Sequence, residues 1–463
     1  MITFGTTLVL ARILVPADFG LVALASVMIG LLSLFSDLGL GGTLVVRRDL
    51  DTRTGGTILT LMLALGAATA LLIAALSPLA ASIYDEPRLT PVLAVLASTV
   101  LLGAPTWFYG TVLQRELEFW RRFKCQLAQS VTYATVAIST AVAGAGVWSL
   151  VAGQLTGTVV LATTLFIAAP YRVRPRFERQ AARDAVREGR GFLAQSGVGF
   201  VENNTDFLSV GGFLGAAQLG YYSMAFRVGE LPYWAVTESV AKVTFPGFAR
   251  MSHRGESVAG SFLSVLGLVT LVACPMGVLL SATAEPFTRT VFGEEWLPMA
   301  GALAILGLWG TVNHVEASVG WLMNSLGRAG LNAAISAIAV GPLVVGVILA
   351  AMLGSIETVA WVMLAHAVAS MVVRMVVADR TLSIPLGGQW RAIRPVVGGS
   401  IAAWFAARAV ADALASTAAP IALVVSVAAG AAAYAATVSV VDPGVIPRSA
   451  SQLRRILRAA PSR

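Results

Sequence analysis

The chain has 463 residues, of which 57% are hydrophobic and only 12% are charged, against roughly 25% charged in an ordinary soluble domain. This composition excludes a soluble enzyme, because too few polar side chains are available to cover a surface in water. The charges come in short clusters between apolar stretches of about 20 residues or more, which are long enough to cross a bilayer. The net charge of +8 would suit a nucleic-acid partner in a soluble protein. Such binding needs a polar surface domain with aromatic residues, and the sequence shows none, so we predict no nucleic-acid partner.

The chain start and the cysteines carry little further information. The first apolar run extends only to about Leu14, which is short for a full span, so we expect an incomplete first span. No basic leader precedes it, and we therefore predict no removed signal peptide. The two cysteines, Cys125 and Cys274, predict neither a disulfide framework nor a metal site.

Apolar windows and the breakers between them predict an all-α multi-pass membrane protein with about fourteen transmembrane helices. The windows are 1–14, 19–46, 54–79, 91–113, 123–143, 147–169, 191–213, 219–246, 257–281, 297–323, 331–353, 357–378, 393–411 and 418–440.

Positive charges predict the orientation of these spans. Most of the 32 Lys and Arg residues fall in alternate connections, at residues 47–53, 115–124, 172–190, 250–254, 328, 374–394 and 448–463. The opposite connections carry only Arg88 and Arg289, with acidic residues beside them. Cytoplasmic loops are enriched in Lys and Arg, so both termini are predicted to be cytoplasmic.

An internal repeat is visible. Residues Leu14–Ala25 align without gaps onto Leu214–Ala225, 200 positions later, with four identities in twelve positions. The pattern indicates two pseudo-symmetric bundles around a central cavity, as in transporters whose halves rock. The predicted organisation is an N-terminal bundle at 1–170, an Arg-rich cytoplasmic linker at 171–190, a C-terminal bundle at 191–378, two further spans at 379–440 and a basic cytoplasmic tail at 441–463.

Short motifs spread over nearly the whole chain carry a family resemblance. They are Leu10–Gly20 (LARILVPADFG), Leu38–Gly42, Arg47-Arg48-Asp49, Gln114-Arg115-Glu116, Gly146–Gly153 (GVWSLVAG), Asn204–Arg227, Phe292-Gly293, Glu295-Trp296 and Leu326-Gly327-Arg328. On these residues the chain resembles the polysaccharide-export flippases, in the superfamily that also contains multidrug and toxin extruders and the lipid II flippase. The first motif and Asn204–Arg227 are the most specific.

The resemblance implies export of a polyprenyl-diphosphate-linked oligosaccharide from the cytoplasmic to the outer leaflet of the cell membrane, by alternating access, for surface polysaccharide assembly. Its partners would be membrane lipids, a polysaccharide polymerase and glycosyltransferases. Each sugar hydroxyl costs several kcal/mol to move into hydrocarbon without a hydrogen-bond partner, so a polar cavity between the halves is expected.

Three alternatives stay open at this point. One is a cation-coupled multidrug-type exporter of amphiphiles on the same scaffold, and another is a non-transporting component of polysaccharide assembly. A membrane glycosyltransferase or polymerase is disfavoured, because the longest connection is the Arg-rich linker at 171–190. We therefore expect no enzyme activity and no cofactor, with proton or sodium coupling.

Ionisable residues within spans are functional candidates, because hydrocarbon tolerates them poorly. The candidate substrate-binding residues are Arg12, Asn203, Asn204, Arg227, Lys242, His314 and Glu316. The candidate ion-coupling residues are Asp37, Glu202, Asp206 and Glu230. Arg12 and Arg227 are the preferred diphosphate ligands, since a cation complements phosphate.

Each candidate also has a structural interpretation. Glu202 and Asp206 share a helical face, so they need a proton or a cation, whereas Arg227 and Glu230 are spaced to neutralise one another. His314 is also interpreted as a hydrogen-bonded interior residue. Gly211 and Gly215 are predicted to be a small-residue packing pair.

Overall fold

The regular structure of the described chain is helical. The computed structural model describes residues 2–37, 52–232 and 236–443, and within these ranges it contains helices and no strand. The all-α prediction is therefore confirmed. The glycine-rich segment 38–42, the motif at 47–49 and most of the basic tail lie outside the described residues, as do the side chains of Asp37 and Lys242.

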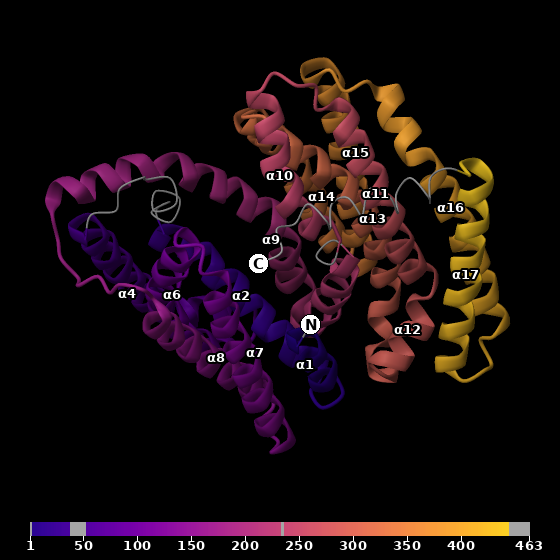
Figure 1. The fold of residues 1–463 in the computed structure, drawn as a ribbon. Coiled ribbons are helices and arrows are strands. Elements are labelled where there is room, and N and C mark those ends of the chain that lie inside the picture. Colours follow the sequence, from indigo (N-terminus) through magenta and orange to yellow (C-terminus); the bar gives the residue numbers. More distant parts are fainter. Residues whose placement is uncertain (1, 38–51, 233–235, 444–463) are drawn as a thin grey trace. The chain divides into compact units, whose positions relative to one another are not determined.

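Two compact units divide the chain at Ser223 and Met224 (Figure 1). The first unit contains α1 (Ile2–Ala11), α2 (Pro16–Asp37), α4 (Thr52–Ile83), α5 (Leu89–Leu96), α6 (Ser98–Arg115), α7 (Phe119–Val142), α8 (Val147–Ala168) and most of α9 (Arg179–Gly229). The second unit contains the end of α9, α10 (Glu238–His253), α11 (Ala259–Ala282), α12 (Ala284–Val291), η2 (Glu294–Met299), α13 (Ala300–Ser325), α14 (Ala329–Met352), α15 (Ile356–Leu382), α16 (Leu386–Ala413) and α17 (Ala419–Val441).

Ten candidate membrane spans occur in the described part of the chain. They lie in α2, α4, α5 with α6, α8, α11, η2 with α13, α14, α15, α16 and α17. The other predicted spans fall on α1, which has 10 residues, and on α7, α9 and α10, whose polar residues make them less apolar. The multi-pass prediction is confirmed, and the number fourteen is not.

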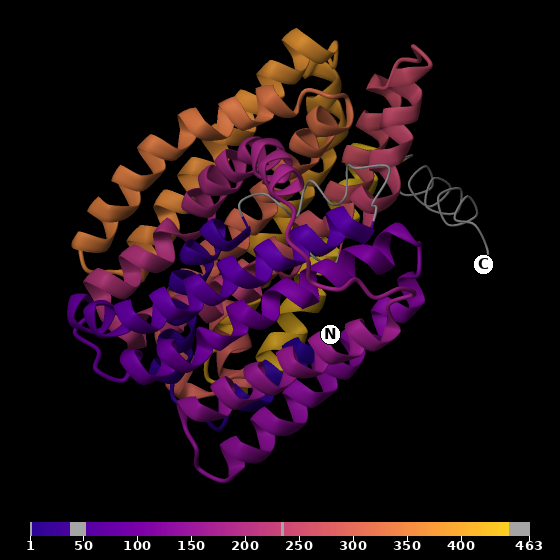
Figure 2. The same cartoon turned by 90° about the vertical axis from the view of Figure 1, so that its left-hand side faces the viewer.

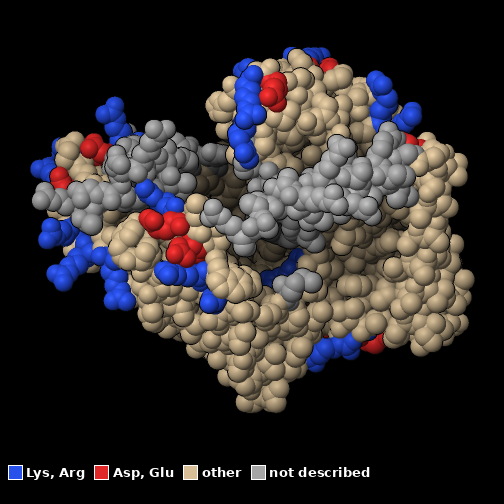
Figure 3. All heavy atoms as spheres, in the orientation of Figure 1, with Lys and Arg blue, Asp and Glu red and all other residues tan. Residues whose placement is uncertain are grey.

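The outer surface of the helices is rich in large apolar side chains. Leu71, Ile338 and Val440 are 72%, 79% and 81% exposed. Soluble proteins rarely expose so many large apolar side chains to water. On the face of the first unit drawn in Figure 3, Lys and Arg gather at the far left, near the start of α9, whereas the surface over α7 and α8 is largely uncharged. This distribution is typical of helices that lie in lipid and carry their charges at one end.

Packing within each unit is dominated by antiparallel helix pairs. α7 and α8 lie side by side in both views (Figures 1 and 2), and α16 pairs with α17 in the second unit. Phe108 and Tyr109 are buried in a core with residues of α4, and Phe262 and Leu322 form the corresponding core of the second unit.

The predicted linker is only partly irregular. Residues 171–178 contain no helix, but α9 begins at Arg179 and continues into the predicted seventh span. The boundary between the two units falls between residues 223 and 224, which is further along the chain than the predicted linker. The first unit therefore includes residues 191–223, which are predicted above to begin the C-terminal bundle.

The two copies of the repeat contact each other inside the first unit. A Cβ atom added to Gly20 would overlap the carbonyl oxygen of Ala216, and one added to Gly220 would overlap that of Pro16. Because Pro16 aligns with Ala216 and Gly20 with Gly220 at the 200-residue offset, the contact is reciprocal. A local two-fold relation between two equivalent segments produces this pattern.

Gly215 has a different function from the one predicted. Gly211 does pack closely, since an added Cβ would lie 3.1 Å from Leu219 Cδ2 and 3.2 Å from Leu24 Cδ1. Gly215 has open space around its Cα, but its φ of 84° and ψ of 174° belong to a region almost restricted to glycine. The packing-pair prediction is therefore wrong for Gly215, which is required by the turn that reverses α9.

Candidate functional site

A buried ion pair joins α13 and α15 in the second unit. The Arg374 guanidinium contacts the Glu316 carboxylate, and the two residues are only 5% and 8% exposed. A buried charge is costly unless it is paired and hydrogen-bonded, so the two side chains depend on each other for their positions.

Three helices hold the Arg374 guanidinium. Its Nε donates to Asn332 Oδ1 at 3.1 Å and its Nη2 donates to Ser336 Oγ at 2.8 Å, both on α14. Its Nη1 also contacts Ser370 Oγ, which donates to Glu316 Oε1 at 2.6 Å. The guanidinium therefore cross-links α13, α14 and α15 through a connected polar network.

A polar cavity of about 160 Å³ opens beside this ion pair. Its wall is made by Asn313, Glu316, Ala317, Gly320, Trp321, Asn324, Asn332 and Arg374. Three amides, one ion pair and one indole therefore surround a space within a single unit. The cavity lies near the turn between α13 and α14, because Asn324 is close to the end of the first helix and Asn332 to the start of the second.

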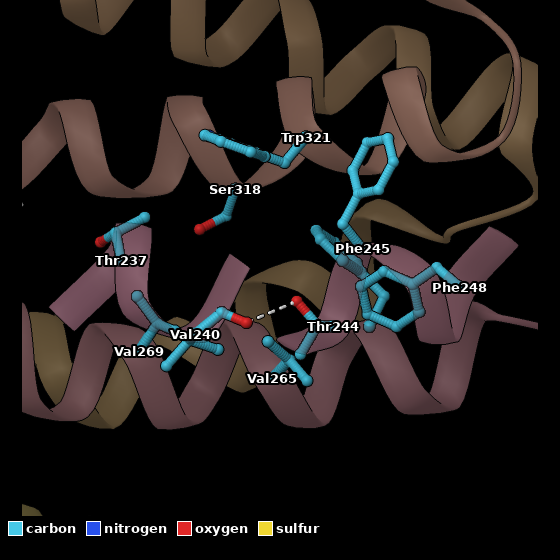
Figure 4. Close-up of a pocket in the computed structure, with 10 residues that line it drawn as sticks. Thr237, Val240, Thr244, Phe245, Phe248, Val265, Val269, Ser318 and Trp321 are labelled. Atoms are coloured by element: carbon cyan, nitrogen blue, oxygen red, sulfur yellow. Dashed lines mark hydrogen bonds between the residues drawn. The ribbon is translucent and has the colours of Figure 1, made fainter. Parts of the chain in front are cut away.

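The indole of Trp321 lines both this polar cavity and a small apolar one. Figure 4 shows Trp321 above a pocket that contains Phe245, Phe248 and Val265. The Phe245 and Trp321 rings meet edge to face, with their centroids 6.4 Å apart. Aromatic packing from α10 therefore fixes one side of the indole.

His314 is an interior hydrogen-bonded histidine, as its structural interpretation predicted. Its side chain is fully buried, and its Nδ1 lies 2.7 Å from Thr237 Oγ1. His314 does not line the polar cavity, which takes Asn313 and Glu316 from the same turn of α13. Its observed contact connects α13 to the residue that precedes α10.

The predicted acidic pair in the first unit is divided by the structure. Asp206 is 1% exposed, and its carboxylate accepts a 2.8 Å hydrogen bond from the Tyr222 hydroxyl, across the Gly215 turn. It also accepts a 2.9 Å bond from the Phe207 backbone N–H. Glu202 is half-buried, so the two acids lie in different environments although they share a helix.

We expect Tyr222→Phe to lower the free energy of unfolding by about 1–3 kcal/mol, because it removes a donor from a buried carboxylate. Denaturant titration of the purified protein in micelles would measure the change. Tyr171→Phe, at an exposed position before α9, is the matched control and should stay within about 0.5 kcal/mol of the wild type. Equal losses in both variants would contradict a specific contribution of the Asp206 hydrogen bond.

The other predicted site residues are dispersed. Arg12, Arg227 and Asn203 are exposed, whereas Asn204 and Glu230 are half-buried. Asn203 and Asn204 donate to backbone carbonyls one turn earlier, at Gly199 (2.6 Å) and Phe200 (2.9 Å). Among the predicted residues of the second unit whose side chains the structure describes, Glu316 lines the polar cavity, whereas Arg227, Glu230 and His314 do not.

The residue that sequence reasoning missed is Arg374. The charge pattern assigns Arg374 to a cytoplasmic connection, and that assignment is wrong, because the side chain is buried within α15. The signal was present, since Arg374 lies inside the predicted span 357–378. An arginine within a span indicates a buried partner.

A short connection of the first unit carries a separate charge cluster. Arg88 donates from Nε and Nη2 to the Glu86 carboxylate at 2.9 and 3.1 Å, which lowers the pKa of Glu86 below its usual value. The Arg88 guanidinium also lies 3.8 Å from Asp18 at the start of α2. The cluster therefore ties the connection after α4 to α2.

An apolar cavity of about 320 Å³ lies between α11, α13 and α16. Its lining residues include Val278, Leu308, Trp404 and Phe405. Phe405 is 65% exposed, so the mouth of the cavity reaches the outer surface of the helices. Such a lining suits a hydrocarbon chain.

These features define a multi-pass helical membrane protein with buried charges inside its bundles. A family described as "Polysaccharide biosynthesis protein" matches residues 9–301, which is more than half of the chain. The chain belongs to this family.

Curated relatives extend the comparison. The chain is 26% identical to the succinoglycan biosynthesis transport protein ExoT of Rhizobium meliloti over 65% of this chain and 62% of that protein. It is 25% identical to the lipopolysaccharide biosynthesis protein WzxC of Escherichia coli over 70% and 66%. It is 27% identical to the teichuronic acid biosynthesis protein TuaB of Bacillus subtilis over 64% and 62%. The chain thus matches slightly less than two thirds of the length of each of these relatives.

Solved structures share the fold. The lipid II flippase MurJ in an inward closed conformation superposes with a TM-score of 0.79 at 12% identity, over 96% of this chain and 98% of that chain. An inward-facing multidrug resistance MATE family transporter of the MOP superfamily gives 0.63 at 13% identity, over 84% and 94%. At these identities the comparisons establish the transporter fold alone.

Proposed function

We propose that the chain is a flippase that moves polyprenyl-diphosphate-linked oligosaccharides from the cytoplasmic to the outer leaflet of the cell membrane. The family match over residues 9–301 carries this proposal, and the curated relatives named for polysaccharide transport and biosynthesis support it. The proposed reaction is movement without covalent chemistry.

The physical basis of the proposal is the cost of moving a sugar head group through hydrocarbon. Buried polar groups such as Glu316, Arg374 and Asp206 are held inside apolar helices by internal partners, so each unit carries polar side chains in its interior. The apolar cavity beside α16 offers a place for part of the polyprenyl chain. The tail would then stay in an apolar environment while the head group exchanges water for protein hydrogen bonds.

Orientation, coupling and partners belong to the same proposal. The basic connections suggest cytoplasmic termini, and with that orientation an inside-negative potential assists outward movement of an anionic head group by about 2.3 kcal/mol per charge per 100 mV. We place the coupling of a proton or sodium ion at Asp206, with Glu202 on the same helix. Glycosyltransferases would act on the cytoplasmic leaflet before transport. A polymerase would act on the outer leaflet after transport.

Depletion of the protein in its host tests the function. Lipid-linked oligosaccharides should accumulate on the cytoplasmic leaflet and surface polysaccharide should fall, with recovery when the wild-type chain is restored. Accessibility of the head group to a membrane-impermeant lectin would separate the two leaflets. Unchanged lipid intermediates together with new drug sensitivity would overturn the proposal in favour of an exporter of amphiphiles.

A further inference from the structure

The polar cavity between α13, α14 and α15 is distinct in composition from a phosphate or cation site. We propose that this cavity binds one neutral sugar ring of the transported head group. The identity of the ligand rests on the proposed function, whereas the class of chemistry comes from the lining residues themselves.

The charge of the cavity wall is balanced. Glu316 and Arg374 are the two charged side chains that line it, and they are paired with each other. A diphosphate requires cations or several unused donors, but Nε, Nη1 and Nη2 of Arg374 already donate to residues of the network. A metal cation would meet the guanidinium charge. The balance therefore favours a ligand without net charge.

The remaining polar groups match hydroxyls. An amide offers both donors and an acceptor, and a hydroxyl is itself a donor and an acceptor. Asn332 donates from Nδ2 to Asn324 Oδ1 at 3.2 Å, and within the described part of the chain no hydrogen bond from the Asn324 Nδ2 is recorded, although Asn324 lines the cavity. Among the described residues, the structure records no hydrogen bond to the Asn313 amide, which also lines the cavity. Two amides are thus available to a polyhydroxylated ligand.

The volume of the cavity is suited to a single sugar ring. At about 30 Å³ per water, a volume of about 160 Å³ corresponds to roughly five waters, which is comparable to one sugar unit and far smaller than an oligosaccharide. Trp321 also lines the cavity, and its indole is in edge-to-face contact with Phe245. An indole face complements the C–H face of a pyranose, while the amides address its hydroxyl edge.

Gly320 allows the cavity to be filled without disturbing the fold. A Cβ atom at Gly320 would lie 3.5 Å from both amide atoms of Asn332 and 3.8 Å from Arg374 Nε, which are ordinary contact distances. Gly320→Ala therefore places a methyl group in the ligand space, and it removes a helix-interior glycine, which favours the helix. The matched control is Gly341→Ala on α14, where an added Cβ meets no atom within 4 Å.

Binding would be measured on the full chain in lipid nanodiscs, with methyl glucoside, methyl galactoside and N-acetylglucosamine as neutral probes and pyrophosphate as the anionic probe. We expect at least one neutral sugar to bind with a dissociation constant on the order of 1 mM, as a single ring with few contacts would. Gly320→Ala and Asn313→Leu should each weaken binding at least tenfold, and Gly341→Ala should leave it unchanged. The sugar-induced change in tryptophan fluorescence should disappear in Trp321→Phe.

Three results would overturn the inference. They are no sugar binding to the folded wild-type chain, sugar binding that both cavity substitutions leave intact, and pyrophosphate binding that Asn313→Leu abolishes. The first would mean that the space is only hydrated, and the third that it is an anion site.

The same variants in the depleted host distinguish this inference from the proposed function. If depletion causes no accumulation of lipid-linked oligosaccharide, the flippase proposal fails whatever the nanodisc result. If depletion does cause accumulation, but Gly320→Ala and Asn313→Leu support transport as well as wild type and bind sugar equally well, only the assignment of this cavity fails.

Discussion

Arg374→Ala should lower the free energy of unfolding by about 3–5 kcal/mol, because it leaves the Glu316 carboxylate buried without its cation. The substitution also removes the donors to Asn332 and Ser336, so α14 loses two of its hydrogen bonds to α15. We expect a large fall in the unfolding midpoint of the purified protein in micelles, together with loss of transport in the depleted host.

Two further variants separate the effect of the Arg374 charge from the effect of its side-chain packing. Arg380→Ala changes an exposed arginine in the same helix and should cost no more than about 0.5 kcal/mol. The double substitution Glu316→Gln with Arg374→Gln removes both charges and should recover part of the loss, since a neutral pair carries no unpaired charge. A double variant as unstable as Arg374→Ala would argue that packing, not charge balance, is what Arg374 supplies.

Gly20→Ala and Gly220→Ala should each destabilise the first unit by about 3 kcal/mol or more, at the upper end of the range for overpacked sites. At both positions the added Cβ would overlap a backbone carbonyl oxygen, which cannot rotate away as a side chain can. Because the contact is reciprocal, either substitution must separate α2 from the second part of α9. Unfolding in micelles and the yield of monodisperse protein would report the effect.

Gly199→Ala is the matched control for this pair. It lies on α9 in the same unit, and an added Cβ would meet no atom within 4 Å. It should be neutral or stabilising by up to about 1 kcal/mol, as expected when alanine replaces glycine within a helix. If Gly20→Ala behaved like Gly199→Ala, the close crossing of the two repeat segments would be contradicted.

Much of the fold could be predicted because the apolar composition of a segment indicates whether it spans a membrane. The apolar windows over α11, α13, α14 and α15 match the helices to within a few residues, since hydrocarbon accepts only segments whose backbone hydrogen bonds are internal. The duplication of Leu14–Ala25 was also visible. The hairpin at Gly215 was not, because a glycine within an apolar run predicts close packing and a positive φ equally well.

The candidate site was only partly predictable. Glu316 was identified because an acid within a span needs a partner, but its partner is Arg374, 58 positions away. Asp206 was likewise identified without Tyr222, to which it is joined across the turn. Asn324 and Asn332 carried no signal, since amides near helix ends are common in any membrane protein.

The sequence by itself determined that the chain is a helical membrane protein with a duplicated segment and charges that need internal partners. Only the tertiary structure decided which charges meet, where the polar cavity lies and that the two repeat segments cross through Gly20 and Gly220. The physical reason is that lipid is as apolar as a leucine side chain. Hydropathy therefore places a helix in the membrane but carries no information about its neighbours, which are chosen by close packing and by the hydrogen bonds of a few polar residues.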